Sequence, residues 1–422
     1  MRPCSRRFAW LLALLIVPPF LWVVVVTLMP TGWACRRIAS HLADATGRPA
    51  RLGSLKLGLL GGVHIGRLES FDPGQTQDPW LRVENLDIDL DLPRLLLGRL
   101  EPGKVDADNV FVRVRRRHDG TFDLAEIFQC RSAPERAALR AERKRRGDPF
   151  VVARLSRGRV VLVDEPTETV LHFDDLEGRG TWDPAMASID ELRGRLNGGP
   201  FLLTGRLDRK ADAPRLEAQL SAREVALDAH MDLMRLLVPV LTGAKAKLAG
   251  TFAIDCELRA KGTNASELGD SLTGTGSIRV DDLDLDGSPF VKELARFIRN
   301  PGDEHIGSFT SDFAISQRKI NSRDMTVTIA RAPLHLTGYT DFDGHLSYTI
   351  QADDLAGRYA PEARQVLGEL PIKLSDLVAL RVEGTTRRPK LKMDRGAADD
   401  GESDDRLKLE RLGRRLLDRI RR

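Results

Sequence analysis

The longest apolar run in this chain covers residues 8–29 and reads FAWLLALLIVPPFLWVVVVTLM, without one charged side chain. A helix needs about 20 such residues to cross the ~30 Å hydrocarbon core of a bilayer. No later stretch of the 422 residues approaches this length. We therefore expect a single membrane span, followed by one large polar body.

Charge and tryptophan placement favour an uncleaved anchor over residues 1–35. Arg2, Arg6 and Arg7 precede the run, and this basic flank favours a cytoplasmic N-terminus with the rest of the chain across the membrane. Indole rings prefer the membrane interfaces, where their N–H groups stay hydrated. The predicted anchor residues are Phe8, Trp10, Trp22, Met29 and Trp33.

Two other interpretations of this segment remain open: a cleaved secretory signal, and a lipoprotein signal that ends at Cys35. The apolar run is longer than an ordinary signal core, and no clear A-x-A cleavage site follows it. Trp33 stands where a lipoprotein signal needs a small residue. These observations favour the anchor.

The charge balance argues against nucleic acid as a partner. The chain has 65 basic and 61 acidic side chains, for a net charge of +4, whereas a dedicated nucleic-acid binder is strongly basic. Its four cysteines lie far apart. Cys130 and Cys256 are the two that could pair beyond the membrane, and their spacing does not decide whether they do.

Alternation of apolar and polar residues with period two dominates the sequence after the span, which predicts a mainly β protein. Leu86, Ile88, Leu90 and Leu92 alternate with three aspartates, as in a sheet with one hydrated face. The same alternation recurs in Val110, Val112 and Val114; in Phe252, Ile254, Cys256 and Leu258; in Met325, Val327 and Ile329; in Leu334 and Leu336; and in Leu346, Tyr348 and Ile350. We expect a long antiparallel meander.

Turn and helix signals divide these strands. Asn197-Gly198-Gly199 and residues 341–344 predict turns. Residues 36–46 predict a helix that ends at Gly47. Further short helices are expected at residues 133–146, 231–241, 290–298, 361–367 and 407–420.

Motifs for catalysis and metal binding are weak. Residues 282–287 read DLDLDG and Glu293 follows, which fits the carboxylate spacing of an EF-hand loop. A strand precedes it instead of a helix, and Leu283 continues the apolar alternation after a one-residue slip at Asp281-Asp282. We therefore expect a strand with an acidic outer face. The eight histidines show no zinc-site spacing, and no nucleophile or phosphate-loop motif stands in the required context. The sequence predicts no catalytic residue, metal or cofactor, and a protein that is not an enzyme.

Two long segments resemble the AsmA family of bacterial envelope proteins. They are TGRPARLGSLKLGLLGGVHIGRLE (residues 46–69) and PWLRVENLDIDLDLPRLLLGRLEPGKVDADNVFVRVRRRHDGTFDLAEIF (residues 79–128). The segment LTGTGSIRVDDLDLDGSPFVKELARF (residues 272–297) and the strands of residues 314–355 resemble the C-terminal domain of that family. The resemblance implies kinship with TamB-like and chorein-like lipid-transfer proteins, whose curved sheets form a groove with an apolar interior.

The expected fold is therefore mainly β with short helices, in which a transmembrane helix precedes a long curved antiparallel sheet that forms an open groove. Acyl chains could cover its apolar face, each buried CH₂ contributing about 0.8 kcal/mol. A sandwich or barrel with a dry core is the alternative. The candidate groove residues are Leu86, Ile88, Leu90, Leu92, Val110, Val112, Val114, Phe252, Ile254, Leu258, Val327 and Ile329.

Basic side chains near the ends of these regions are candidates for headgroup or membrane contact. They are Arg36, Arg37, Arg143, Arg145, Arg414 and Arg415. The arginines around residue 143 also suit a solvated insertion, and the tail helix also suits a cap on the open sheet.

The predicted regions are an anchor (1–35), an AsmA-like, chorein-like N-terminal region (36–130), a charged insertion or linker (131–150), an AsmA-like β-rich C-terminal region (151–395), and an acidic linker with a basic amphipathic tail helix (396–422). We expect a single-pass protein of the bacterial inner membrane with its body in the periplasm. It would bind phospholipid acyl chains and support lipid transport and outer-membrane assembly or homeostasis, with phospholipids, the inner membrane and an outer-membrane or envelope protein as partners. The alternative is a scaffold or quality-control factor, free of lipid, for outer-membrane protein assembly.

Overall fold

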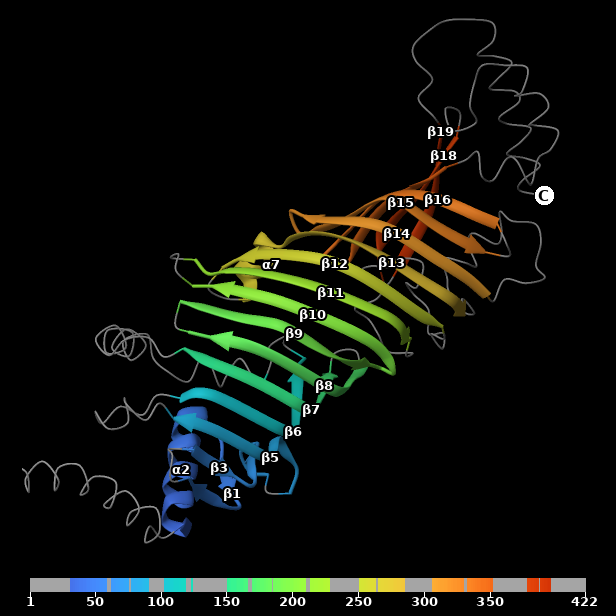
Figure 1. Ribbon diagram of the computed structural model, residues 1–422. Coiled ribbons are helices and arrows are strands. Elements are labelled where there is room, and N and C mark those ends of the chain that lie inside the picture. The colour runs from blue at the N-terminus through green and yellow to red at the C-terminus, as the bar shows by residue number, and fades with distance from the viewer. Residues whose placement is uncertain are drawn as a thin grey trace, which may run out of the picture. The chain divides into compact units, whose positions relative to one another are not determined.

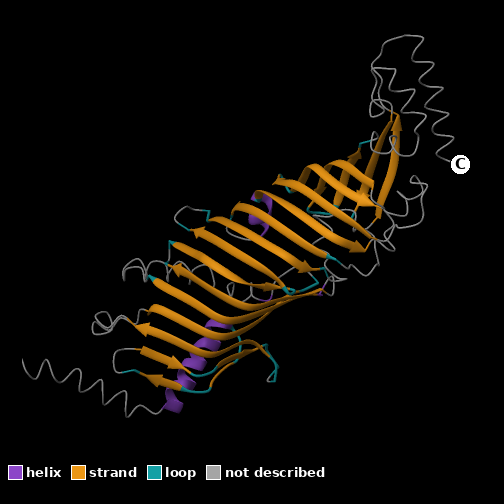
Figure 2. Cartoon of the chain, turned by 45° about the vertical axis from the view of Figure 1, so that its right-hand side comes forward, coloured by secondary structure: helices purple, strands orange, loops and turns teal. Residues whose placement is uncertain are grey.

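The computed structural model describes residues 31–58, 62–75, 77–90, 102–118, 123, 150–165, 169–183, 185–209, 213–227, 250–262, 265–284, 306–329, 332–351, 378–386 and 388–395. Strands dominate this part of the chain, as Figures 1 and 2 show. They belong to one large open sheet, which confirms the mainly β prediction. Within the described ranges there are two helices, α2 (Thr31–Thr46) and α7 (Ala265–Ser271), and neither has the length and apolar character that a membrane crossing requires. The predicted span at residues 8–29 lies outside them.

Two compact units divide the chain. The first comprises residues 1–195 and 204–210, and the second comprises residues 196–203 and 211–422. The first unit contains α2 (Thr31–Thr46), β1 (Ala50–Leu52), β2 (Leu55–Leu57), β3 (Gly62–Ile65), β4 (Leu68–Phe71), β5 (Pro79–Leu90), β6 (Pro102–Arg116), β7 (Val151–Asp164), β8 (Thr169–Trp182) and nearly all of β9 (Met186–Leu196). The strand β10 (Gly199–Asp208) contributes residues to both units.

The second unit continues the β pattern. It contains β11 (Arg215–Ala226), β12 (Thr251–Lys261), α7 (Ala265–Ser271), β13 (Thr273–Asp284), β14 (Ile306–Ser316), β15 (Lys319–Ile329), β16 (Ala332–Asp341), β17 (His345–Ile350), β18 (Val378–Thr385) and β19 (Arg388–Arg395). From β11 to β19 each strand pairs antiparallel with the next. This stretch confirms the predicted meander.

The antiparallel prediction is wrong for β6 and β7, because these strands pair in parallel, with Val112 opposite Val160. A parallel pair needs a crossover of a dozen or more residues, since the chain must return to the end of the sheet where the first strand began. Residues 117–150 provide this length. The sequence signal for this crossover is the long interval between the two strand patterns, part of which is predicted to be an insertion or linker (131–150).

The helix α2 (Thr31–Thr46) includes the helix predicted at residues 36–46 and ends as predicted. Gly47 adopts a φ of 70°, and its N–H donates to the Ala43 carbonyl at 2.8 Å. Cys35 and Leu42 of α2 pack on a buried cluster from β2 to β5, which comprises Leu55, Ile65, Leu68 and Val83. Figure 2 shows α2 lying across these first strands. The other predicted helices lie outside the described residues.

Non-glycine residues with positive φ interrupt several strands. Asn109, Arg157 and Asp175 lie within β6, β7 and β8, and Asp282 lies within β13, all with φ of 51–52°. The register shifts between Val280 and Leu283, yet both side chains are fully buried. A bulge adds one residue and so returns the next side chain to the same face. The slip predicted at Asp281-Asp282, and the strand interpretation of residues 282–284, are confirmed.

Candidate functional site

Paired residues across β5 to β8 of the first unit form a surface that we call the apolar face. Directly opposed residues share a face of a sheet, and successive residues alternate between faces. The positive-φ residues Asn109, Arg157 and Asp175 interrupt this alternation, so residues five apart across them lie on the same face. Three rows of opposed residues cross these strands: Leu86, Ala107 and Leu155; Leu81, Val112, Val160 and Phe173; and Val114, Leu162 and Leu171. All of these side chains are half-buried. Leu81, Leu86 and Ala107 also pack against the cluster under α2.

The opposite side of the same strands, which we call the charged face, carries ionic side chains. Asp87, Asp106, Arg154 and Arg179 oppose one another across β5, β6, β7 and β8. Neighbouring ion pairs join Arg157 to Asp108, Arg159 to Asp174, Arg179 to Glu191, Arg193 to Glu177 and Arg195 to Asp175. Such exposed pairs contribute about 0–1 kcal/mol each. The charged face is therefore a hydrated surface.

Asp108 has the most perturbed carboxyl group of this face. The hydrogen bond from the Arg157 guanidinium is the largest cause that lowers its pKa from 3.8 to about 2, and bonds from Ser156 and Asn85 act in the same direction. The pair also raises the pKa of Arg157. Both groups stay ionised over the physiological pH range, so neither can serve as an acid or a base there.

The second unit has the same two-faced pattern, but three of its groove candidates are buried. Phe252 is 5% exposed, Ile254 8% and Val327 0%. Leu258 is half-buried. Cys256 is a buried free thiol whose pKa is raised by burial, and Cys130 lies outside the described residues. The groove candidates thus fall into two environments, an accessible one in the first unit and a closed one in the second.

Some predicted residues cannot be placed on either face. Leu90 and Ile329 end their strands, and their side chains are outside the description, as is all of Leu92. Arg36 and Arg37 are exposed on α2, and Trp33 lies in its first turn. The remaining anchor and headgroup candidates, which are Phe8, Trp10, Trp22, Met29, Arg143, Arg145, Arg414 and Arg415, lie outside the described residues.

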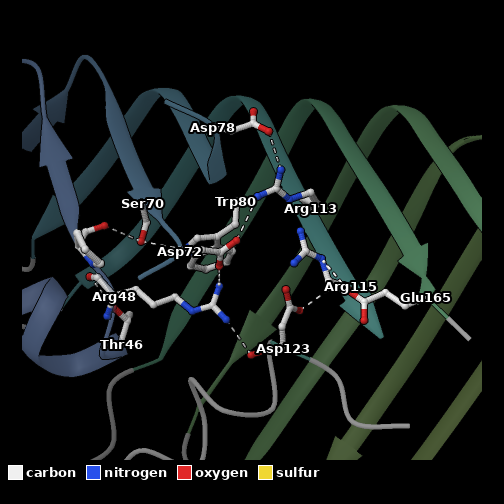
Figure 3. A network of polar contacts seen from close by, with 11 residues as sticks. Thr46, Arg48, Ser70, Asp72, Asp78, Trp80, Arg113, Arg115, Asp123 and Glu165 are labelled. Atoms are coloured by element: carbon white, nitrogen blue, oxygen red, sulfur yellow. Dashed lines mark hydrogen bonds and ion pairs between the residues drawn. The ribbon is translucent and has the colours of Figure 1, made fainter. Parts of the chain in front are cut away.

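A buried arginine holds the end of α2 to the sheet (Figure 3). Arg48, which follows the helix-ending glycine, is 5% exposed. Its guanidinium lies 2.7 Å from Asp72 Oδ1, donates to the Asp123 carbonyl at 3.1 Å, and stacks 5.0 Å from the centre of the Trp80 ring. The Trp80 indole N–H donates to Ser70 Oγ at 3.0 Å. The Arg48 guanidinium, the Asp72 carboxylate and the Trp80 indole N–H thus each have an ion-pair or hydrogen-bond partner.

Arg113 extends this network along the ends of the strands. It joins Asp72 at 3.1 Å and Asp78 at 2.9 Å. Beside it, the Arg115 N–H donates to Asp123 Oδ1 at 2.9 Å. Arg48 belongs to the TGRP stretch and Asp123 to the HDGTFD stretch of the segments that resemble the AsmA family. Their role here is structural, because the arginines link the residue after α2 to β4, β5 and β6.

A scan against models of protein families finds no match to this chain, and a search of curated proteins finds none either. The resemblance to the AsmA family therefore rests on the quoted motifs.

Proposed function

We propose that the chain is a membrane-anchored periplasmic protein that binds phospholipid acyl chains on the apolar face and supports lipid transport and outer-membrane homeostasis. The observation that carries the proposal is the pair of contrasting faces on β5 to β8. One face is a set of half-buried apolar side chains in three opposed rows, and the other carries several ion pairs. Its work is physical, with no catalytic residue assigned.

An uncovered apolar face needs a partner layer. In the described part of the first unit, α2 is the one helix, and its Cys35 and Leu42 pack on the buried cluster from β2 to β5. Val160, Leu162, Leu171 and Phe173 lie beyond the residues that α2 contacts. Acyl chains suit these residues because each CH₂ removed from water contributes about 0.8 kcal/mol.

The second unit suggests where lipid contact ends. Phe252, Ile254 and Val327 are already buried, so acyl chains would gain little further apolar contact from them. The proposed contact is therefore concentrated on β5 to β8. Transport across an envelope would then need a partner or a membrane at the far end.

Site-specific photocrosslinking tests the proposal in cells. A photoreactive amino acid replaces Val160, on the apolar face, or its neighbour Val161, which opposes Arg113 and His172 on the other face. We expect phospholipid adducts, identified by mass spectrometry, from position 160 and not from position 161. Adducts from both positions alike, or from neither, would contradict the lipid assignment. A protein adduct at position 160 without lipid would favour the scaffold alternative.

A further inference from the structure

The charged face of the first unit contains a hollow of about 600 Å³ between β6, β7, β8 and β9. Three arginines and three acids line it. They are Arg154, Arg179, Arg193, Asp106, Glu177 and Glu191. A lining with equal numbers of both charges suits neither a simple anion nor a simple cation.

Four of these six groups neutralise one another. Arg193 lies 2.7 Å from Glu177, and Arg179 lies 3.4 Å from Glu191. Arg154 makes no ion pair with any residue that the structure describes. It is exposed, and its register partner on β8 is Arg179. Like charges directly opposed on a sheet destabilise it, so this position favours an added anion.

Asp106 provides the complementary group. Lys104 contacts one oxygen of its carboxylate. The other oxygen, Oδ1, is shielded from water and accepts no hydrogen bond in the described structure. A carboxylate oxygen without a donor costs free energy, so this atom favours an added donor.

The Asp106 carboxylate, which lacks a donor, and the Arg154 guanidinium, which lacks an anion, are neighbours. Asp106 and Arg154 are opposed in the parallel pair of β6 and β7, where strands lie about 4.8 Å apart. A ligand that satisfies both must carry an anion and a cation joined by a short linker. Flexible side chains such as that of Lys104 must shift for the cation to reach Asp106.

We propose that this hollow binds a zwitterion in which a phosphate is joined to an ammonium group, with the phosphate on Arg154 and the ammonium on Asp106. The chemistry is shared by free phosphorylated amines and by zwitterionic phospholipid headgroups. The site lies on the charged face and does not depend on acyl chains binding to the apolar face.

Calorimetric titration of the full chain in detergent micelles tests the proposal with three probes: O-phosphoethanolamine, inorganic phosphate and ethanolamine. We expect O-phosphoethanolamine to bind at least tenfold more tightly than either fragment. Arg154→Gln should weaken it at least tenfold, and Asp106→Asn should do the same while leaving the binding of phosphate unchanged. Arg195→Gln removes an equal charge from β9 outside the hollow, and it should change the affinity less than twofold.

Three results would overturn the proposal: no saturable binding of O-phosphoethanolamine, an equal loss in Arg195→Gln, or phosphate binding as tightly as the zwitterion. Unchanged circular dichroism would show that each variant is folded. Coupling of Arg154 and Asp106 in a double-mutant stability cycle, without probe binding, would mean that the two residues only pair with each other. Competition by phosphatidylethanolamine vesicles would identify a lipid headgroup as the source, and its absence would identify a soluble ligand.

Discussion

Arg48→Met is the sharpest test of how the helix is held to the sheet, because methionine keeps an unbranched apolar stem and deletes the charge. The variant loses the 2.7 Å ion pair with Asp72, the 3.1 Å bond to the Asp123 carbonyl and the stacking on Trp80. Hydrogen bonds that involve a charged group contribute about 1.5–3 kcal/mol each. Removing one member of a buried ion pair costs about 3–5 kcal/mol when the other charge is left alone.

Asp72 is not left alone, because Arg113 stays 3.1 Å away. We therefore expect Arg48→Met to lower the free energy of unfolding of the first unit by about 2–3 kcal/mol, below the full cost of an orphaned charge. Since the chain comprises two compact units, one global melting temperature is a poor measure of the stability of the first unit. Hydrogen exchange of peptides from β4 and β5, followed with increasing urea, reports the first unit directly.

Arg82→Met on β5 is the matched control. Arg82 pairs with Glu69 at 3.1 Å, but its side chain is 42% exposed, so we expect a loss below about 1 kcal/mol. Equal losses for the two variants would refute the buried-network argument. So would an additive Arg48→Met, Asp72→Asn double mutant, because groups in direct contact should be energetically coupled.

Three further outcomes are expected. Tyr348→Phe should destabilise the second unit by about 1–2 kcal/mol at neutral pH, because it leaves the buried Thr340 hydroxyl without its 2.9 Å partner. Burial raises the pKa of Tyr348 above 10.0, so the native protein should lose stability as pH rises past that value and through the folded pKa, and the Phe variant should lose less in urea titrations across this range. Glu224 lies at a register shift of β11, between Ala222 and Val225, and has a φ of 51°. Glu224→Gly should stabilise the protein by up to about 1 kcal/mol, whereas Glu224→Val should destabilise it by about 1 kcal/mol or more; the reverse order of stabilities, measured by hydrogen exchange of β11 peptides in urea, would contradict the strained conformation. Ile88→Asp should cost at least about 2 kcal/mol in urea unfolding and Asp89→Asn less than about 0.5 kcal/mol, and equal costs would mean that the face assignment is wrong.

Much of the fold is readable from local pattern. Period-two alternation locates β5, β6, β12, β15, β16 and β17, because each strand presents one side to a core and the other to water. The end of α2 at Gly47 is readable too, since a glycine accepts a positive φ without strain. The slip at Asp281-Asp282 is visible because two apolar side chains must return to one face.

Which strands pair with one another cannot be predicted from local sequence pattern. The parallel pair of β6 and β7, the registers that assemble the apolar face, and the row that brings Asp106 beside Arg154 all depend on which strand lies next to which. Arg48 is a further example, because the residues near it in sequence do not predict that its side chain contacts Asp72, Trp80 and Asp123. Alternation determines which face a residue takes, since it follows from backbone geometry over a few residues. The neighbours of a residue across the sheet, and the depth of its burial, depend on contacts between segments far apart in the chain. Only the tertiary structure decides those neighbours and that depth.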